Sequence, residues 1–233
     1  MVNWHPPDSQ GPRGSIAPTA FAALNSKELS LGESTIHPLI ELSERKARLR
    51  VDAAVLRRNA WLHAGLSASQ ALIDFGSPLA EILRARSGTA VGGYYPVRDE
   101  LDPRGLIEFF HRKHFRIGLP KTAPGPMLTF RQWIPGTRLM RGKFRIQEPG
   151  DGQPEIIPDL VLVPLLAFDR MGNRLGYGAG FYDVALRALR RNGSIIAAGL
   201  GFDEQELTEI PREPQDEPLD MIVTPSRIIA CGD

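Results

Sequence analysis

Residues 159–191 read DLVLVPLLAFDRMGNRLGYGAGFYDVALRALRR, and this stretch decides the fold. It opens with a dense apolar run, residues 160–168, whose length and Val and Leu content predict a strand buried on both faces. A turn follows, and then a glycine run at residues 176–180. Apolar residues next recur at helical spacing over residues 181–189. The order of strand, glycine loop and helix predicts one unit of a parallel α/β sheet.

The glycine run favours an anion site. Glycine at every second position leaves the backbone N–H groups open to a ligand, and the helix that follows adds unpaired donors and the positive end of its dipole. Arg174, just before the run, can make a bidentate phosphate contact, and Asp183 can cap the helix or hold a cation. The spacing is neither a Walker loop nor a dinucleotide motif, and the glycines alone fit a flexible turn equally well. Arg174 and the aromatic pair Phe181-Tyr182 favour a nucleotide-phosphate site.

Composition excludes several classes of protein. The chain has 233 residues and a formal net charge of +1, so no charge bias predicts a nucleic-acid or membrane partner. The single cysteine, Cys231, excludes an intrachain disulfide framework and a cysteine-based metal site. No apolar stretch reaches the roughly 18 residues of a spanning helix, and the N-terminus has no signal pattern. These features predict a cytoplasmic protein, which we expect to be a monomer with small-molecule partners.

The N-terminal part of the chain divides near residue 36. Residues 1–36 are rich in Pro, Gly, Ser and Ala, and they predict a disordered tail before a single domain at residues 37–233. The first helix is expected over residues 38–61. Three of its basic residues share one helix face, namely Lys46, Arg50 and Arg57. Such a face is usually solvated, and the alternative is that it clamps a polyphosphate.

The remaining elements alternate between helix and strand. We expect helices at residues 67–86 and 103–114, strands at 89–97, 116–119, 127–130, 195–200 and 221–224, and a loop at 136–158. In the helix at 67–86, Ser67 or Ser69 is a candidate cap, and Pro78 is a candidate site for a kink or a split. Alternating elements predict a mostly parallel sheet covered on both faces, with ligands at the carboxyl ends of its strands. Residues 95–100 and the glycine run lie at two such ends.

Four motifs, in order along residues 42–230, resemble those of the 5-formyltetrahydrofolate cyclo-ligase family. They are Lys46-Ala-Arg-Leu-Arg50 in the first helix, Tyr95-Pro-Val-Arg-Asp-Glu100, the run LVPLLAFDRMGNRLGYGAGFYDVAL, and the C-terminal run with Gln205, Asp216 and Asp220. The resemblance implies a single Rossmann-like α/β domain with a mostly parallel sheet flanked by helices, of the NagB/RpiA/CoA transferase-like kind. It also implies ATP- and Mg²⁺-dependent closure of 5-formyltetrahydrofolate to 5,10-methenyltetrahydrofolate, with release of ADP and phosphate.

The resemblance also implies site residues. Catalysis is assigned to Lys46, Arg50, Arg174 and Tyr182. ATP is expected to contact these four and the loop residues Leu175, Gly176, Tyr177, Gly178, Ala179, Gly180 and Phe181. The reduced folate is expected to contact Tyr95, Glu100 and Trp133, and to share Tyr177, Gly178, Ala179, Gly180 and Phe181. Mg²⁺ is expected on Asp183 and Asp216. Trp133 fits stacking on the ligand and a place in the core equally well.

The chain departs from the family pattern at two positions, and two other functions stay open. Phe181 stands where the family commonly has Tyr, which removes a hydroxyl, and Ala179 fills a position often held by Gly or Lys. One alternative is a paralogue that keeps the nucleotide loop and acts on another substrate. The other is a non-catalytic nucleotide-binding module, which would not need the two carboxylates expected to hold Mg²⁺.

Overall fold

The computed structural model describes the backbone of residues 26–142 and 146–232, and side chains from residue 41 onward within those ranges. The chain divides into two units, residues 1–40 and 41–233. The first unit contributes the helical backbone from Ser26 to Ile40, and everything below concerns the second. Residues 1–25, part of the expected tail, lie outside the described residues. Among the described helices, none is long and apolar enough to span a membrane.

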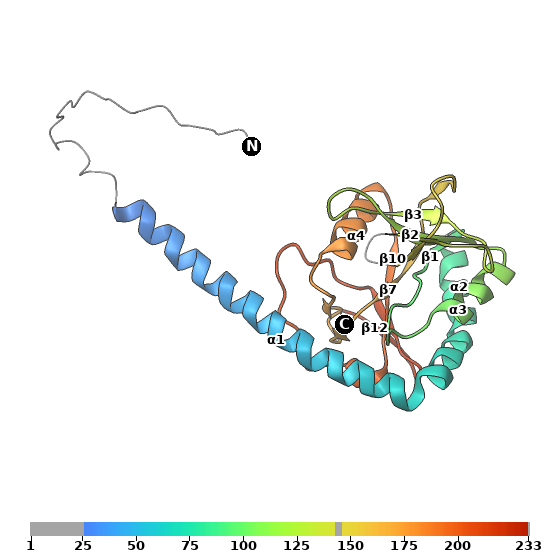
Figure 1. Ribbon diagram of the computed structural model, residues 1–233, viewed down its shortest axis with the longest axis horizontal. Helices are drawn as coiled ribbons and strands as arrows, with labels where there is room; N and C mark the ends of the chain where they lie inside the picture. The colour runs from blue at the N-terminus through green and yellow to red at the C-terminus, as the bar shows by residue number, and fades with distance from the viewer. Residues whose placement is uncertain (1–25, 143–145, 233) are drawn as a thin grey trace, which may run out of the picture. The chain divides into compact units, whose positions relative to one another are not determined.

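An eight-stranded sheet forms the centre of the second unit, in the order β12-β11-β10-β7-β1-β2-β3-β6 (Figure 1). The strands β11, β10, β7, β1 and β2 are parallel, and β12, β3 and β6 add antiparallel edges. The principal strands are β1 (Ala90–Gly92), β2 (Arg116–Thr122), β3 (Leu128–Gln132), β7 (Leu160–Pro164), β10 (Ile196–Leu200), β11 (Met221–Val223) and β12 (Ile228–Ala230). The predicted mostly parallel α/β sheet is therefore confirmed.

The apolar run at residues 160–168 is two strands, so the single predicted strand was wrong. β7 leaves the sheet at Pro164, which has no N–H to donate to a further ladder bond. The chain then turns into a separate hairpin of β8 (Ala167–Phe168) and β9 (Arg174–Leu175). Gln205 fixes the turn because its buried side-chain amide donates to the carbonyls of Leu165 and Leu166. This break directs the glycine loop away from the sheet.

The helices differ from prediction mainly at their ends. α1 runs from Ser26 to Ala71, so it starts before and ends after the expected helix. Ser67 and Ser69 lie inside it and donate to carbonyls one turn back, so neither caps a helix. A 3₁₀ turn, η1 (Leu72–Phe75), interrupts the expected helix and leads to α2 (Gly76–Ala85), where Pro78 falls in the first turn, so the helix is split just before Pro78 rather than kinked at it. The other two helices are α3 (Arg104–Arg112) and α4 (Phe181–Asn192).

Short strands occupy part of the region expected to be a loop. They are β4 (Met140–Arg141), β5 (Gln147–Glu148) and β6 (Glu155–Ile156). We expected β2 to stop at Pro120, but the strand continues through it. Pro120 pairs with Phe130 of the antiparallel neighbour β3. β12 had no counterpart in the prediction, since its strand is short and only half-buried.

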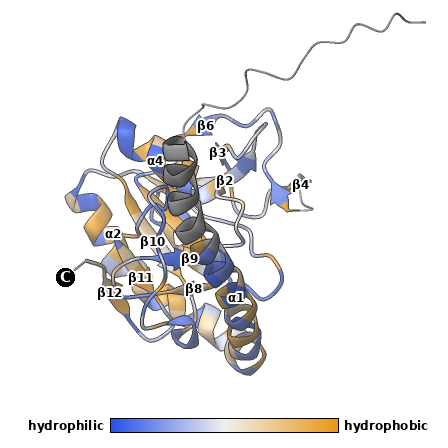
Figure 2. Cartoon of the chain, turned by 90° about the vertical axis from the view of Figure 1, so that its left-hand side faces the viewer, coloured by the Kyte–Doolittle hydropathy of each residue, from blue (hydrophilic) through white to orange (hydrophobic). Residues whose placement is uncertain are grey.

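Alternating strand residues divide the core between the two faces of the sheet. Leu160 and Leu162 face a cluster built with α2, α3 and the end of α1, whereas Val161 and Val163 face a cluster that includes Leu186 of α4. Figure 1 accordingly places α2 and α3 together on one side of the sheet and α4 on the other. Figure 2 shows both hydrophobic and hydrophilic residues along α2, as expected of a helix with one buried face.

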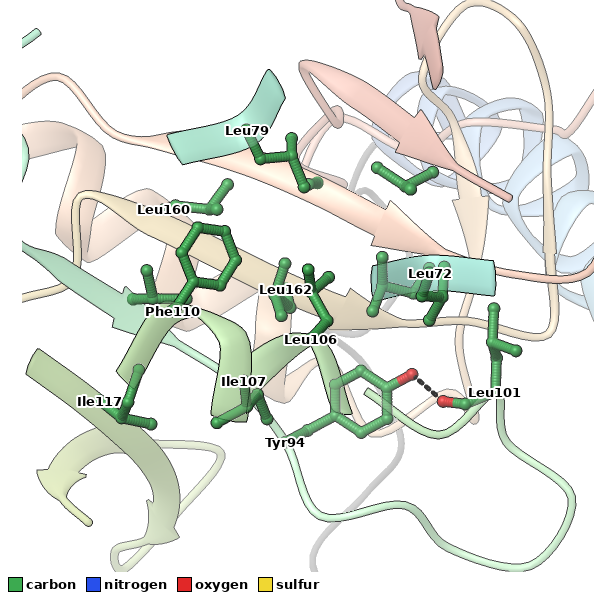
Figure 3. Close-up of a cluster of buried hydrophobic side chains, with 14 of the residues drawn as sticks. Leu72, Leu79, Tyr94, Leu101, Leu106, Ile107, Phe110, Ile117, Leu160 and Leu162 are labelled. Carbon is green, nitrogen blue, oxygen red and sulfur yellow. Dashed lines mark hydrogen bonds between the residues drawn. The ribbon is translucent and has the colours of Figure 1, made fainter. Parts of the chain in front are cut away.

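Figure 3 shows the larger of these clusters, in which Leu106, Ile107 and Phe110 of α3 pack toward Leu160 and Leu162. Tyr94 lies at its edge, and its hydroxyl donates to the carbonyl of Leu101 at 2.5 Å. This bond closes the loop after β1, so that the loop starts and ends on the core. A third, smaller cluster joins Ala53 of α1 to the β8–β9 hairpin. The packing thus brings α1, the closed loop and the glycine loop to the carboxyl edge of the sheet.

Candidate active site

A cavity of about 600 Å³ lies at this carboxyl edge. It is bounded by α1, by the loop after β1, by the glycine loop with the start of α4, and by the loop before β11. Pro164, the last residue of β7, lies in its wall. Crevices outside the carboxyl ends of parallel strands are the usual ligand sites of open α/β sheets, so the cavity is where the strand order predicts it.

Nearly every residue expected to bind a ligand lines this one cavity. They are Lys46, Arg50, Tyr95, Glu100, Arg174, Leu175, Gly176, Tyr177, Gly178, Ala179, Gly180, Phe181, Tyr182, Asp183 and Asp216. Trp133 is the exception. Its ring is buried in the core cluster with α3, and its indole N–H donates to the carbonyl of Thr137 at 3.2 Å. The structure therefore supports the core alternative for Trp133, not stacking on a ligand in the cavity.

The glycine loop has the backbone conformation that only glycine adopts easily. Gly178 has a φ of +94° and Gly180 a φ of +69°, and Gly180 is the residue that caps α4. No side chain caps the first turn of α4, so Asp183 does not act as the cap. Arg50 holds the loop from α1, because its Nε donates to the carbonyl of Gly176 at 3.0 Å. The loop therefore presents its backbone to the cavity beside a helix N-terminus, an arrangement suited to an anion.

Lys46 reaches the cavity from α1 and is buried, with 5% of its side chain exposed. Its Nζ lies 2.7 Å from Oε2 of Glu213 and is also paired with Asp216. The expected solvated face of α1 is therefore wrong, since Arg57 on the same face is buried as well. A buried ammonium needs such partners because desolvation disfavours an isolated charge.

Arg174 is the second buried cation of the cavity. Its guanidinium donates to Oδ1 of Asp183 at 2.6 Å and to the carbonyl of Glu217. Burial lowers the pKa of Arg174 from its ordinary value, and the charge of Asp183 opposes this effect. Asp183 also accepts from the backbone N–H of Glu217 at 3.0 Å. Each carboxylate expected to hold Mg²⁺ is thus paired with a cation expected to hold phosphate.

These two carboxylates fit Mg²⁺ only in a particular way. Among the described residues, no group of three or more His, Cys, Asp or Glu side chains could hold a metal ion. Asp183 and Asp216 both line the cavity, and carboxylate oxygen is the donor that Mg²⁺ prefers. One or two carboxylates completed by nucleotide phosphates are the common form of a Mg²⁺ site, and the donor set fits that form.

The opposite wall of the cavity holds one carboxylate in apolar surroundings. Glu100 is 6% exposed, and its Oε2 accepts from the backbone N–H of Val97 at 2.8 Å. Burial raises the pKa of Glu100 to about 7, although the bond from Val97 and the nearby charge of Arg57 act to lower it. Tyr95 lies in the same loop, and its hydroxyl accepts from Arg104 at 3.3 Å. This carboxyl group therefore titrates near neutral pH.

Tyr182, the second residue of α4, is partly buried and lines the cavity, and desolvation raises its pKa well above the ordinary value for tyrosine. It therefore stays protonated at neutral pH. Sequence reasoning missed several other cavity residues, namely Tyr94, Arg98, Thr122, Glu148, Glu213 and Gln215. Glu148 is buried and accepts from the hydroxyl of Thr122 at 2.7 Å. The two side chains come from separate strands, so no local sequence pattern joins them.

A family model for the 5-formyltetrahydrofolate cyclo-ligase family matches residues 42–225. The chain belongs to this family. A 5-formyltetrahydrofolate cyclo-ligase of Haemophilus influenzae is 29% identical over 183 residues, which cover 76% of this chain and 96% of the relative. A cyclo-ligase of Mycolicibacterium smegmatis is 37% identical over 157 residues, 62% of this chain and 78% of that protein.

Solved structures give the same family. The NMR structure of a 5,10-methenyltetrahydrofolate synthetase from Aquifex aeolicus has a TM-score of 0.65 and 27% identity, and the match covers 81% of this chain and 93% of that one. A synthetase from Mycoplasma pneumoniae, with 19% identity and a TM-score of 0.54, shares the fold. The cyclo-ligase family match covers the cavity residues on α1, the loop after β1, the glycine loop and the loop before β11.

Proposed function

We propose that this protein uses ATP to convert 5-formyltetrahydrofolate to 5,10-methenyltetrahydrofolate, with release of ADP and phosphate. The observation that carries the proposal is one cavity with two unlike walls. One wall combines a glycine loop, a helix N-terminus and the cations Lys46, Arg50 and Arg174. The other holds Glu100 and Tyr95 on a loop closed by Tyr94. The first suits a polyphosphate and the second a neutral, donor-rich ring.

The chemistry explains why the two walls share a cavity. An N-formyl amide is a poor electrophile, because its oxygen is a poor leaving group. Transfer of the terminal phosphoryl group of ATP to that oxygen makes it one. Attack of N10 on the formyl carbon then closes the ring, and the C–O bond breaks as the oxygen departs with inorganic phosphate. Phosphoryl transfer depends mainly on positioning and charge neutralisation, so both substrates must meet in one place.

Lys46, Arg50 and Arg174 are the residues that would neutralise the phosphates. Lys46 is paired with Asp216 and Arg174 with Asp183, so each of these cations already has a carboxylate partner in the site. Phosphate oxygens would replace these carboxylates as partners of the cations. The freed Asp183 and Asp216 would hold Mg²⁺, which supplies charge stabilisation on the phosphates when bound. This exchange would leave Lys46, Arg174, Asp183 and Asp216 each with a partner of opposite charge.

Glu100 would hold the pterin ring, because a carboxylate accepts well from the adjacent N–H groups of an amino-pyrimidinone. Tyr95 and residues 177–181 line the same cavity, and residues 177–181 would lie between the two ligands. Phe181 lacks the hydroxyl common in the family, so its expected contribution is packing alone. Tyr182 stays protonated at neutral pH, so its hydroxyl can donate a hydrogen bond to a ligand.

The test is absorbance during incubation of the purified protein with 5-formyltetrahydrofolate, Mg²⁺ and ATP, beside an ATP-free sample. Growth of the methenyl chromophore only with ATP is the expected result. ATP turned over without the chromophore would replace the proposal with a paralogue acting on another substrate. Nucleotide binding without any turnover, unchanged by Asp183→Ala, would instead favour a non-catalytic binding module.

A further inference from the structure

Arg57 is buried behind the cavity rather than in its wall, and it contacts both of the walls described above. Its side chain is 2% exposed. One nitrogen, Nη2, lies 2.8 Å from Oδ1 of Asp99 and 2.6 Å from the hydroxyl of Tyr177. The other, Nη1, lies 4.0 Å from Oε1 of Glu100. A single side chain of α1 thus joins the loop that carries Glu100 to the glycine loop that carries Tyr177.

The contacts are not those expected of a residue that serves stability alone. Nε of Arg57 is buried and has no hydrogen-bond partner within the described part of the chain, and buried polar groups usually have one. Tyr177, by contrast, is 53% exposed, and its ring lies at the cavity with the guanidinium 5.3 Å from the ring centroid. The buried guanidinium of Arg57 therefore holds the exposed side chain of Tyr177, which belongs to the glycine loop. Such a bond adds little to the core, but it orients a residue that faces the ligands.

We call the wall of the glycine loop, Lys46, Arg50 and Arg174 the nucleotide wall, and the wall of Tyr95 and Glu100 the folate wall. We infer that Arg57 is a positioning residue that couples the two walls, through Asp99 on the folate side and the hydroxyl of Tyr177 on the nucleotide side. This inference rests on the proposed function. When the folate occupies the wall of Glu100, the loop of Asp99 is fixed, and Arg57 is held in the position that orders Tyr177. ATP then meets a glycine loop that is already ordered, so each ligand should bind more tightly in the presence of the other.

The same geometry predicts an effect on Glu100. The charged and titratable groups that face this carboxyl are Arg57 from α1, Asp99 and Tyr94 from its own loop, and Tyr177 and Tyr182 from the glycine loop and α4. Arg57 is the cation among them that lowers the pKa of Glu100. Loss of this charge should raise that pKa and move the acid limb of kcat/KM for the folate to higher pH.

The experiment measures the dissociation constant of a non-hydrolysable ATP analogue with and without saturating 5-formyltetrahydrofolate. The variants are Tyr177→Phe, which removes one hydroxyl from an exposed ring, Arg57→Lys and Arg57→Gln. The matched control is Arg58→Gln, the same change at the neighbouring exposed position of α1. Thermal unfolding of each variant separates lost coupling from lost folding. In the wild type we expect the folate to tighten analogue binding by roughly fivefold or more.

The coupling ratio is the dissociation constant of the analogue without the folate divided by that with it. Tyr177→Phe and Arg57→Gln should bring this ratio close to one, whereas Arg58→Gln should keep the wild-type ratio. Arg57→Gln should also shift the acid limb of kcat/KM for the folate to higher pH. Should Arg57→Gln not fold, Tyr177→Phe and Arg57→Lys still decide the matter. A wild-type ratio retained in Tyr177→Phe and Arg57→Lys would overturn the inference, as would a wild-type enzyme that turns over with no coupling at all. A wild-type protein that forms no methenyl product would instead overturn the proposed function, and the inference with it.

Discussion

The two walls of the cavity control buried charge in opposite ways. On the wall proposed to bind the nucleotide, Lys46 and Arg174 are buried. Their partners are the carboxylates of Asp216, Glu213 and Asp183, which lie within ion-pair distance. On the folate wall, Glu100 has a distant cation at 4.0 Å, and burial raises its pKa to about 7. Pairing gives each cation of the first wall a carboxylate partner, whereas desolvation makes the carboxyl group of the second titrate near neutrality. The buried cations of one wall are therefore paired, and the charge of Glu100 on the other depends on pH.

This difference follows from what each wall is proposed to bind. Polyphosphate carries several negative charges and demands cations, which need temporary partners when the site is empty. A pterin ring is neutral and offers N–H donors, so a single acceptor suffices and apolar surroundings strengthen its hydrogen bonds. The following predictions test the contrast, from the largest expected effect to the smallest.

Asp183→Asn removes the carboxylate that the nucleotide wall shares between Arg174 and the expected Mg²⁺. We expect kcat to fall by roughly 100- to 1,000-fold, because charge stabilisation at the transferring phosphoryl group is lost. Steady-state kinetics at saturating ATP measure the effect, and thermal unfolding checks that the buried Arg174 has not destabilised the fold. Asp52→Asn, at an exposed position of α1, is the control. A kcat within about threefold of wild type would rule out a catalytic role for this carboxylate.

Glu100→Gln keeps the shape of the folate wall and removes its charge. A hydrogen bond to a charged group is worth about 1.5–3 kcal/mol, so KM for 5-formyltetrahydrofolate should rise by roughly 10- to 100-fold. KM for ATP should stay within about twofold, since the nucleotide wall is unchanged. Initial rates with each substrate varied in turn give both constants. The control is Glu108→Gln, at an exposed position of α3, which should change neither KM. Equal changes of the two KM values in Glu100→Gln would contradict the assignment of separate walls to the folate and to ATP.

The folate wall should also be the pH-sensitive one. Glu100 is a carboxylate above about pH 7 and is protonated below it, so kcat/KM for the folate should fall as pH drops through 7. Glu100→Gln should abolish this limb. The raised pKa has a consequence for stability too: stability associated with the neutral carboxyl is present below its ordinary pKa of 4.5 and is lost as pH rises to about 7. Glu100→Gln stays neutral at every pH. The melting temperature of the variant minus that of the wild type should therefore be larger at pH 8 than at pH 4. An acid limb that persists in the variant would assign the titration to another group.

Trp133→Phe should have the smallest effect on catalysis. The indole lies in the core cluster and donates to the carbonyl of Thr137, and Trp133 is not among the residues that line the cavity. We expect KM for the folate within about twofold of wild type. The lost hydrogen bond and the smaller ring should lower the free energy of unfolding by about 1–3 kcal/mol, as measured by denaturant titration. A rise in KM comparable with that of Glu100→Gln would place the indole at the ligand instead.

Local sequence determined the central unit of this protein. The Val and Leu content of residues 160–163, the glycines at 178 and 180 and the apolar spacing of α4 each depend on neighbours within a few residues, so the strand, loop and helix were predictable. The parallel sheet followed from the alternation of elements. The ends of helices and strands were harder to predict from the sequence. The helix α1, for example, continues through Ser67 and Ser69, although either residue could have capped a new helix.

Only the tertiary structure decided how charges are partnered. The sequence shows Lys46, Arg50 and Arg57 on one helix face, but not that Lys46 meets Asp216 or that Arg57 lies between Asp99 and Tyr177. These contacts join residues far apart in the chain, and their strength depends on burial, which no local pattern encodes. For the same reason, the sequence named Glu100 as a ligand-binding residue, whereas its pKa near neutrality arises from the desolvation that the assembled cavity imposes.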